Sequence, residues 1–357
     1  MTTSIATPVG VLGAPQAVDR LAGYLQGKGL IPGGNNGIEV RHLTGGQSNP
    51  TYCVSTGDSS YVIRTKPPGA LLSSAHAIDR EYRVMSALAD TAIPVPAMHD
   101  YCDDAGVIGT PFYVMEFLEG RVLVDQSLPG MAPQRRRAIY AEMSRVLSSL
   151  HKVGIDAAGL ADYGRRGNYI ARQVDRWSRQ VLTGPQGACR ELEQLAGWLP
   201  RHIPASDPVA LVHGDFRMDN LVFHPSEDRV IGVLDWELST IGHPLVDFSY
   251  HCLSWHISPA LWRGIAGLDL DALGIPDEAV YLDWYRAQTG VEPAENWDFY
   301  IAYNLFRLAA IMHGIAQRAA AGNAASADAL ETGRKAQPLA RLALDYAARH
   351  EAAHSSR

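Results

Sequence analysis

An aspartate and an asparagine five residues apart lie between two short apolar runs in the second half of the chain. His213-Gly214-Asp215 opens this segment and Asn220 closes it, and the flanking runs predict buried strands joined by a tight turn. A third apolar run then ends at Asp235. Kinase-type phosphoryl transfer uses one carboxylate to orient and deprotonate the attacking hydroxyl, and an Asn and a second Asp to hold magnesium. The order therefore predicts Asp215 as the base and Asn220 and Asp235 as metal ligands.

The same residues also have a purely structural explanation. Asp215 and Asn220 are common turn formers, and Asp235 could simply end a strand. A lone His-Gly-Asp would be weak evidence for chemistry, but two acidic motifs at this separation are much more specific. Glu237, two residues beyond Asp235, is a further candidate for contact with the metal or the acceptor.

The paired motifs resemble a known family. His213-Gly214-Asp215 with Asn220, followed by Ile231-Gly232-Val233-Leu234-Asp235-Trp236-Glu237, is similar to the aminoglycoside phosphotransferase and choline kinase branch of the protein-kinase-like fold. The resemblance implies an α+β, bilobal fold with a small antiparallel-sheet lobe over residues 1–118 and a larger, mainly helical lobe over 119–357. It implies an ATP- and Mg²⁺-dependent transfer to a small-molecule hydroxyl. It also implies that Asp247 braces the catalytic loop and that His213 is structural.

Length and composition fit two packed lobes, because 357 residues exceed what one core usually serves and 46% of them are hydrophobic. The net charge of -7 and the pI near 6.0 argue against nucleic acid or a membrane surface as partner. The four cysteines form no Cys-x-x-Cys pair, which indicates reduced thiols. We find no signal peptide and expect no membrane span, so the chain is predicted to be cytoplasmic, with its oligomeric state open.

Ahead of the catalytic segment, residues 38–54 show a strand, a polar glycine-containing turn over 44–50, and a second strand. Small residues let backbone N–H groups and the Ser48 hydroxyl approach phosphate closely. The resemblance places such a loop, often with Ser and Asn, at this position, and so marks Ser48 and Asn49 as nucleotide ligands. A plain hairpin turn is the alternative, because the Gly-x-Gly-x-x-Gly pattern is absent.

The next predicted strand, Tyr61-Val62-Ile63-Arg64, carries an arginine where protein kinases carry a lysine. Arg64 can neutralise nucleotide phosphates, with Lys66 on the same strand face as a substitute. The resembled fold pairs this cation with a glutamate, which we expect to be Glu81 on a helix over about residues 75–88. An exposed strand end and a solvated helix residue are the alternatives for Arg64 and Glu81.

Residues 110–120 read as one strand ending at Gly120. In the resembled fold this is the hinge, where the adenine edge pairs with backbone groups. The resemblance therefore implies that Glu116 supplies a carbonyl and Leu118 an N–H. A buried central strand would show the same pattern.

Helices are predicted for most of the remaining chain. Apolar positions recur at helical spacing over residues 135–151, and residues 296–321 are apolar nearly all round, which indicates a buried helix. The Ala-rich stretch over 325–348 predicts one or two more helices.

Arginines cluster just after the first of these helices, in a chain that is acidic overall. They are Arg165, Arg166, Arg172 and Arg176. Arg172 and Arg176 are one helical turn apart and share a face, which suits an anionic acceptor. Solvated surface charge is an equal alternative.

A closer resemblance concerns four segments, at residues 43–52, 64–69, 74–82 and 108–117. They look like the kinase-like domain that accompanies acyl-CoA dehydrogenases, a branch that includes kinases acting on the hydroxyl of 4-hydroxyacyl-CoA. The resemblance implies an acyl-CoA-like acceptor, which would suit the arginines because coenzyme A is anionic. The alternatives are an aminoglycoside or choline-type kinase, which would need an acidic cleft for a cationic acceptor, and a nucleotide-binding pseudokinase or partner-binding module.

Overall fold

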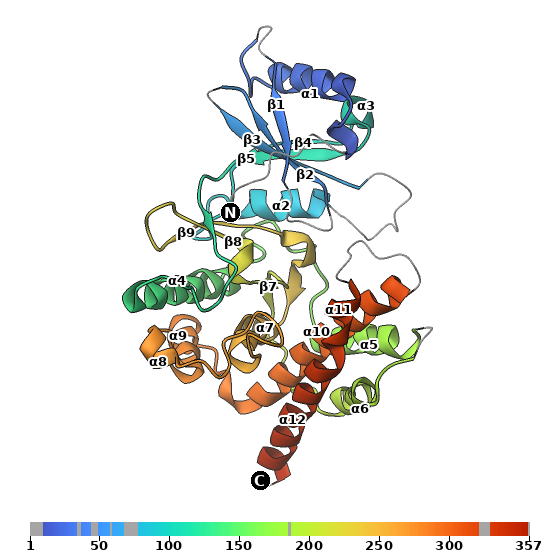
Figure 1. Cartoon of the computed structure of the whole chain (residues 1–357), viewed down its shortest axis with the longest axis vertical. Coiled ribbons are helices and arrows are strands. Elements are labelled where there is room, and N and C mark those ends of the chain that lie inside the picture. The colour runs from blue at the N-terminus through green and yellow to red at the C-terminus, as the bar shows by residue number, and fades with distance from the viewer. Residues whose placement is uncertain are drawn as a thin grey trace. The chain divides into compact units, whose positions relative to one another are not determined.

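The computed structural model describes residues 10–33, 37–43, 49–57, 59–67, 78–184, 187–320 and 329–355. The chain forms two compact units, which can be followed by colour in Figure 1. The first unit contains Met1–Arg121 and Ile231–Glu237, and the second contains Val122–Val230 and Leu238–Arg357. The short segment Ile231–Glu237, which carries Asp235, thus belongs with a unit that is distant in sequence.

A five-stranded antiparallel sheet in the order β1-β2-β3-β5-β4 forms the centre of the first unit. Its strands are β1 (Glu39–His42), β2 (Thr51–Ser55), β3 (Ser60–Thr65), β4 (Met98–Cys102) and β5 (Phe112–Glu116). The central strands are rich in β-branched and aromatic residues and are buried over most of their length, as suits strands covered on both faces. The small antiparallel sheet expected from the sequence is therefore present.

Helices complete this unit. They are η1 (Gly10–Leu12), α1 (Pro15–Gly27), α2 (Ile78–Leu88) and α3 (Ala105–Ile108). Leu21 and Leu25, one turn apart on α1, belong to the core that contains Phe112 of β5. Helix α2 buries Glu81 together with Val84, Met85 and Leu88. A carboxylate therefore lies on the apolar face of α2, where it needs polar partners.

Strand β5 is shorter than predicted, because it ends at Glu116 and not at Gly120. In the antiparallel register Glu116 faces Tyr61, and the partner strand β3 begins at Ser60, so the ladder runs out at this end. Residues 117–120 form irregular backbone, followed by the two-residue strand β6 (Arg121–Val122).

The second unit is mainly helical, as expected. Its α-helices are α4 (Pro133–His151), α5 (Tyr169–Leu182), α6 (Arg190–Trp198), α7 (Pro244–His256), α8 (Leu270–Leu273), α9 (Glu278–Thr289), α10 (Trp297–Ala320), α11 (Ala329–Arg334) and α12 (Ala336–Ser355). Its short strands are β7 (Ala210–Val212), β8 (Leu221–Phe223) and β10 (Thr240–Gly242), of which β7 and β10 pair antiparallel. Strand β9 (Val230–Val233) leads into the segment shared with the first unit. The 3₁₀ turns are η2 (Leu199–Arg201), η3 (Met218–Asn220), η4 (Trp236–Leu238) and η5 (Ala294–Asn296).

Helix α10 is the core helix of the second unit and packs against α5, α7, α11 and α12. The buried helix predicted over residues 296–321 is confirmed. By length and composition α10 could cross a membrane, which the sequence analysis did not anticipate, but 78% of its most apolar window is buried inside the protein. Two polar residues on it, Asn304 and Arg307, are buried as well. Buried polar groups need partners, and Arg307 finds one in the loop described next.

Candidate active site

The catalytic loop, residues 213–220, connects β7 to β8 and ends in the 3₁₀ turn η3. Gly214 has a φ of +82°, and a Cβ at this position would lie 2.6 Å from the Leu238 carbonyl oxygen. Both facts exclude side chains, because the left-handed region disfavours them and the space is already occupied. The glycine of the His-Gly-Asp motif is thus required by the close approach of two backbones.

Asp247 of α7 fixes the backbone of this loop through hydrogen bonds. Its carboxylate accepts hydrogen bonds from the N–H groups of His213 at 2.7 Å and Gly214 at 2.8 Å, and it lies 3.2 Å from Nε2 of His151. Burial opposes ionisation of Asp247, but the hydrogen bond from His151 and the backbone donors outweigh burial and hold its pKa below the usual value. The structural brace expected at Asp247 is confirmed.

His213 is fully buried, and its Nδ1 accepts a hydrogen bond from the N–H of Asp215 at 3.2 Å. Arg307 of α10 donates to the carbonyl of Gly214 at 2.7 Å. The loop backbone is therefore held by three side chains from different parts of the second unit, and the structural role predicted for His213 agrees with these contacts.

The Asp215 carboxylate is oriented by three donors. Tyr250 O–H donates to Oδ1 at 2.6 Å, and Nδ2 of Asn220 donates to Oδ2 at 3.0 Å and to the Asp215 carbonyl at 2.9 Å. Nη2 of Arg217 donates to Oδ2 at 3.2 Å, and Nε of the same arginine forms an ion pair with Oδ1 at 3.0 Å. Burial raises the pKa of Tyr250, so the phenol stays protonated and donates. With its side chain 17% exposed, Asp215 is fixed in orientation yet accessible, as a base that meets a substrate hydroxyl must be.

A second set of charged residues lies in the first unit and is called the Arg64 cluster: Arg64, Glu81 and Asp235. Nε of Arg64 lies 2.8 Å from Oε2 of Glu81, which is the ion pair expected from the sequence, and Nη2 lies 2.9 Å from Oδ1 of Asp235. Glu81 also accepts hydrogen bonds from Tyr113 O–H at 3.0 Å and Nδ2 of Asn49 at 2.9 Å. Burial raises the pKa of Glu81 to about 7, and Arg64 opposes that rise.

Asp235 follows β9 with a φ of +65°, a conformation that Asp and Asn adopt more readily than other residues with side chains. Its side chain is 33% exposed. Trp236 is buried beside it and donates from Nε1 to the Val233 carbonyl at 2.8 Å. The left-handed backbone of Asp235 is a form of local strain, and such strain is concentrated at functional sites.

The donor types present fit magnesium. Nδ2 of Asn220 is engaged by Asp215, which directs the amide oxygen elsewhere, and Asp235 offers a partly exposed carboxylate. Oxygen donors of these two kinds suit Mg²⁺, which takes one or two protein ligands and completes its shell with water and phosphate. The described residues contain no group of three or more His, Cys, Asp or Glu arranged to hold a metal. Glu237 is exposed in η4.

The other residues predicted to bind the nucleotide lie outside the described residues, are engaged by protein groups, or lie on irregular backbone. Ser48 lies outside the described residues. Asn49 is 1% exposed, and its amide is used by Glu81. Glu116 is exposed at the end of β5, and its N–H donates to the Ala97 carbonyl at 2.9 Å. Leu118 is half-buried in the irregular backbone that follows.

The four arginines proposed for the acceptor have varied surroundings. Arg172 of α5 donates to the carbonyls of Arg165, at 2.7 Å, and of Gly167, so its guanidinium holds its own loop. Arg166 pairs with Asp156, and Arg176 is exposed, with its guanidinium carbon 5.2 Å from the Trp177 ring centroid. Arg165 is exposed. Clustering in sequence therefore does not yield four cations converging on one ligand; their role in acceptor binding stays a prediction.

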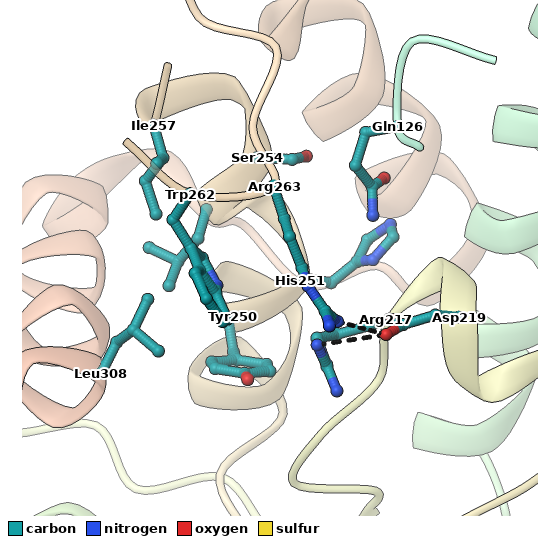
Figure 2. A pocket seen from close by; sticks show the side chains of 11 residues that line it. Gln126, Arg217, Asp219, Tyr250, His251, Ser254, Ile257, Trp262, Arg263 and Leu308 are labelled. Atoms are coloured by element: carbon teal, nitrogen blue, oxygen red, sulfur yellow. Dashed lines mark hydrogen bonds and ion pairs between the residues drawn. The ribbon is translucent and has the colours of Figure 1, made fainter. Parts of the chain in front are cut away.

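A pocket of about 440 Å³, counted with its open mouth, lies beside the catalytic loop within the second unit. Its lining includes Arg217, Asp219 and Tyr250 from the loop and α7, together with Trp262 and Arg263 (Figure 2). Figure 2 shows Arg217 and Arg263 both directed at Asp219. Sequence reasoning singled out neither this pocket nor Tyr250, Arg217 and Arg307. Arg307 did carry a signal, because a charge within an otherwise apolar helix must find a buried partner.

Comparison with known proteins adds family evidence. Residues 39–287 match a family described as the phosphotransferase enzyme family. Acyl-CoA dehydrogenase family member 10 of Mus musculus is 44% identical over 332 residues, which cover 92% of this chain and 31% of that protein. Acyl-CoA dehydrogenase family member 11 of Rattus norvegicus is 41% identical over 317 residues, which cover 87% of this chain and 40% of that protein. This chain thus spans less than half the length of these relatives.

A solved structure supports the same fold. A protein of Ralstonia eutropha JMP134, provisionally assigned as an aminoglycoside phosphotransferase, is 48% identical to this chain. The two superpose with a TM-score of 0.85, covering 93% of this chain and 98% of that chain. The protein-kinase-like fold predicted from the paired motifs is confirmed.

Proposed function

This chain belongs to the phosphotransferase enzyme family, and we propose that it transfers the terminal phosphoryl group of ATP, with Mg²⁺, to a hydroxyl of a small molecule. Membership supports a small-molecule kinase. The observation that carries the proposal is the catalytic loop, where Tyr250 and Asn220 fix a partly exposed Asp215 carboxylate. A carboxylate so oriented can accept the proton of an attacking hydroxyl while it aligns the oxygen.

The remaining roles follow from charge and donor type. Asn220 and Asp235 would hold Mg²⁺, with Glu237 as a further candidate, and the ion neutralises charge on the transferring phosphoryl group. Arg64 would bind nucleotide phosphates with a planar fork of N–H donors. Glu81 orients Arg64, because its ion pair fixes the direction of the guanidinium. Asp215 lies in the second unit and the Arg64 cluster in the first.

For the acceptor, we propose the hydroxyl of an acyl thioester of coenzyme A as the first class to test. The support is the identity of 41–44% to proteins named as acyl-CoA dehydrogenase family members, along the part of those proteins that this chain covers. An aminoglycoside acceptor has the assignment of the solved relative as support. These acceptors differ in sign of charge, which makes them separable in one assay.

The test is ADP release from ATP and Mg²⁺ in the presence of hydroxyacyl-CoA thioesters, aminoglycosides or choline, with product identified by mass spectrometry. Asp215→Asn keeps the size and the hydrogen-bonding shape but removes the base, so kcat should fall by about 10³-fold. Asp283→Asn, which changes an exposed carboxylate of α9, is the matched control and should leave kcat unchanged. Turnover by Asp215→Asn at the parent rate would refute the assignment of the base, and turnover with aminoglycosides or choline alone would refute the thioester acceptor.

A further inference from the structure

The proposed function gives no role to the pocket beside the catalytic loop, although charged and aromatic side chains line it. We propose that this pocket, and not the arginines near α5, receives the acceptor, and that Arg263 selects acceptors that carry a negative charge. The inference rests on the proposed kinase function, since it names the acceptor class of the same site. The pocket lies wholly within the second unit.

A series of ion pairs connects the proposed base, Asp215, to residues that line the pocket. Arg217 bridges two carboxylates, because Nε lies 3.0 Å from Oδ1 of Asp215 and Nη1 lies 3.4 Å from Oδ2 of Asp219. Nη1 of Arg263 pairs with the same oxygen of Asp219 (Figure 2). An acceptor whose hydroxyl reaches Asp215 from this pocket would therefore pass near Arg263, which also lines the pocket.

Arg263 has donors to offer a ligand. Its side chain is 42% exposed, and among the described residues its guanidinium has one carboxylate partner, Asp219, which it shares with Arg217. A guanidinium has five N–H donors in a fork that matches a carboxylate or phosphate. One shared carboxylate leaves most of that capacity for an anionic group of the acceptor.

The backbone holds Arg263 in an unusual conformation, with a φ of +27°. The residues that follow are fixed on the end of α7, since Ile265 N–H donates to the Ser254 carbonyl at 2.7 Å and Ala266 N–H to the Ile257 carbonyl at 3.1 Å. Gly264 is needed there, because a Cβ would lie 1.7 Å from the Ile257 carbonyl oxygen. Backbone strain that the surrounding structure maintains in this way is concentrated at functional sites and ligand clamps.

The neighbouring wall is aromatic and aliphatic. The Trp262 ring is near two cations, with the Arg263 guanidinium carbon 5.1 Å and the Lys335 ammonium 5.0 Å from its centroid. Ile257 and Leu308 add apolar surface. The pocket therefore suits a hydroxylated compound with an apolar chain and an anionic group. Two arginines, Arg217 and Arg263, and one carboxylate, Asp219, line the pocket, so among these groups a cationic acceptor meets net repulsion.

Hydroxylated probes with the same carbon chain length can test how the charge of the acceptor affects its binding. They are 6-hydroxyhexanoate, its neutral methyl ester, the cationic 6-amino-1-hexanol, and the coenzyme A thioester of 6-hydroxyhexanoate. Calorimetry on the full chain at low salt should show that the acid or the thioester binds about tenfold more tightly than the ester and the amine. If both the acid and the thioester bind more tightly than the uncharged and cationic probes, a carboxylate is sufficient for recognition. If only the thioester does, the phosphates of coenzyme A are the recognised anions.

Variants then locate the selection. Arg263→Gln should abolish the preference and Arg263→Lys should retain it, because charge is the property tested. Arg286→Gln is the matched control, since Arg286 is an exposed arginine that pairs with carboxylates elsewhere in the second unit. An anion preference that survives in Arg263→Gln overturns the proposal, as does an unaltered affinity for anions when salt is raised in the parent protein. The absence of preference, or of binding by every probe, also overturns it.

Failure of the kinase proposal has a different signature. It would appear as no Asp215-dependent release of ADP with any acceptor, whereas the ranking of probe affinities needs no turnover. The two readouts therefore separate an error about the reaction from an error about the pocket.

Discussion

The Arg64 cluster and the catalytic loop hold their reactive carboxylates in different ways. Asp235 in the first unit contacts a cation on another strand, Arg64, at 2.9 Å. Asp215 in the second unit sits on a loop whose backbone is itself fixed by hydrogen bonds to Asp247 and from Arg307. A carboxylate held by a cation can exchange that partner for a metal ion, whereas a carboxylate on a braced loop keeps its direction. We expect nucleotide and metal to rearrange the first region and the acceptor to find the second already formed.

The largest effect is expected from removing the cation of the first region. In Arg64→Met at about pH 8, Glu81 loses the counter-ion that opposes the rise of its pKa. The buried site then holds either an unpaired charge or a carboxyl that must take up a proton, and the first unit should lose roughly 3 to 5 kcal/mol of unfolding free energy. Hydrogen exchange of peptides from β3 and α2 at increasing urea reports this unit separately from α10. The double variant Arg64→Met, Glu81→Gln should regain much of the loss, because both buried charges are gone. An equal loss in the double variant would show that packing, not charge, holds the cluster.

Acid should affect the two regions in opposite directions. Burial lowers the pKa of His243 and of His251 from the ordinary 6.5 to about 4, so the unfolded chain binds protons more readily between these values. Their stabilising effect is complete above the unfolded pKa and is lost as pH falls, by roughly 2 kcal/mol per histidine between about pH 7 and about pH 5. Glu81 has the opposite sign, since its raised pKa makes the folded first unit bind the proton more readily.

The measurement is unfolding in urea across this pH range, again followed unit by unit. The second unit should weaken toward acid pH while the first does not. His251→Gln should remove only part of the pH dependence of the second unit, because His243 and His350 also have a pKa lowered by burial to about 4. A parallel response of the two units to acid would contradict this difference.

Binding of MgATP should depend on the negative charge of Asp235. Asp235→Asn keeps a residue that tolerates the left-handed backbone but removes the negative charge, so affinity for ATP in the presence of Mg²⁺ should fall about tenfold. Affinity for ATP without metal should rise or stay the same, because Arg64 loses a competing carboxylate. Calorimetry with and without Mg²⁺ checks both statements. An equal fall in both conditions would remove Asp235 from the metal site.

The smallest expected effects concern the arginines near α5. Arg172→Ala removes a donor to two loop carbonyls and should cost about 1 kcal/mol of stability, whereas Arg176→Ala should change stability by less than about 0.5 kcal/mol. Neither should alter KM for the acceptor if Arg263 makes the selection. A raised acceptor KM in Arg176→Ala, with the KM for ATP unchanged, would restore the acceptor site predicted from the sequence.

Features encoded by neighbouring residues could be predicted from the sequence. Asp215 and Asn220 lie on one turn, and a short polar stretch between two apolar runs has few ways to fold. The pairing of Arg64 with Glu81 followed from the resemblance, because a strand and the next helix in that fold place these positions together. The boundaries of β5 were less predictable, since they depend on where its partner β3 begins.

The supports of the site could not be predicted, because they come from distant parts of the chain. Tyr250 is 35 residues from Asp215, and Arg307 is 93 residues from Gly214. The four arginines near α5 illustrate the converse: their spacing indicates proximity but not what each guanidinium contacts, and Arg172 turned out to hold carbonyls of its own loop. Arg263 and Trp262 attracted no attention in sequence because neither belongs to a periodic pattern.

The bond from Arg307 to the Gly214 carbonyl also bears on how the protein is made. The His-Gly-Asp motif leaves the ribosome well before α10 does, so the loop cannot acquire this support until α10 has been synthesised as well. Until then α7 exposes the apolar surface that α10 will cover. Maturation of the site is thus a late event in synthesis, and a chain arrested before Arg307 should carry every predicted reactive residue and still be inert.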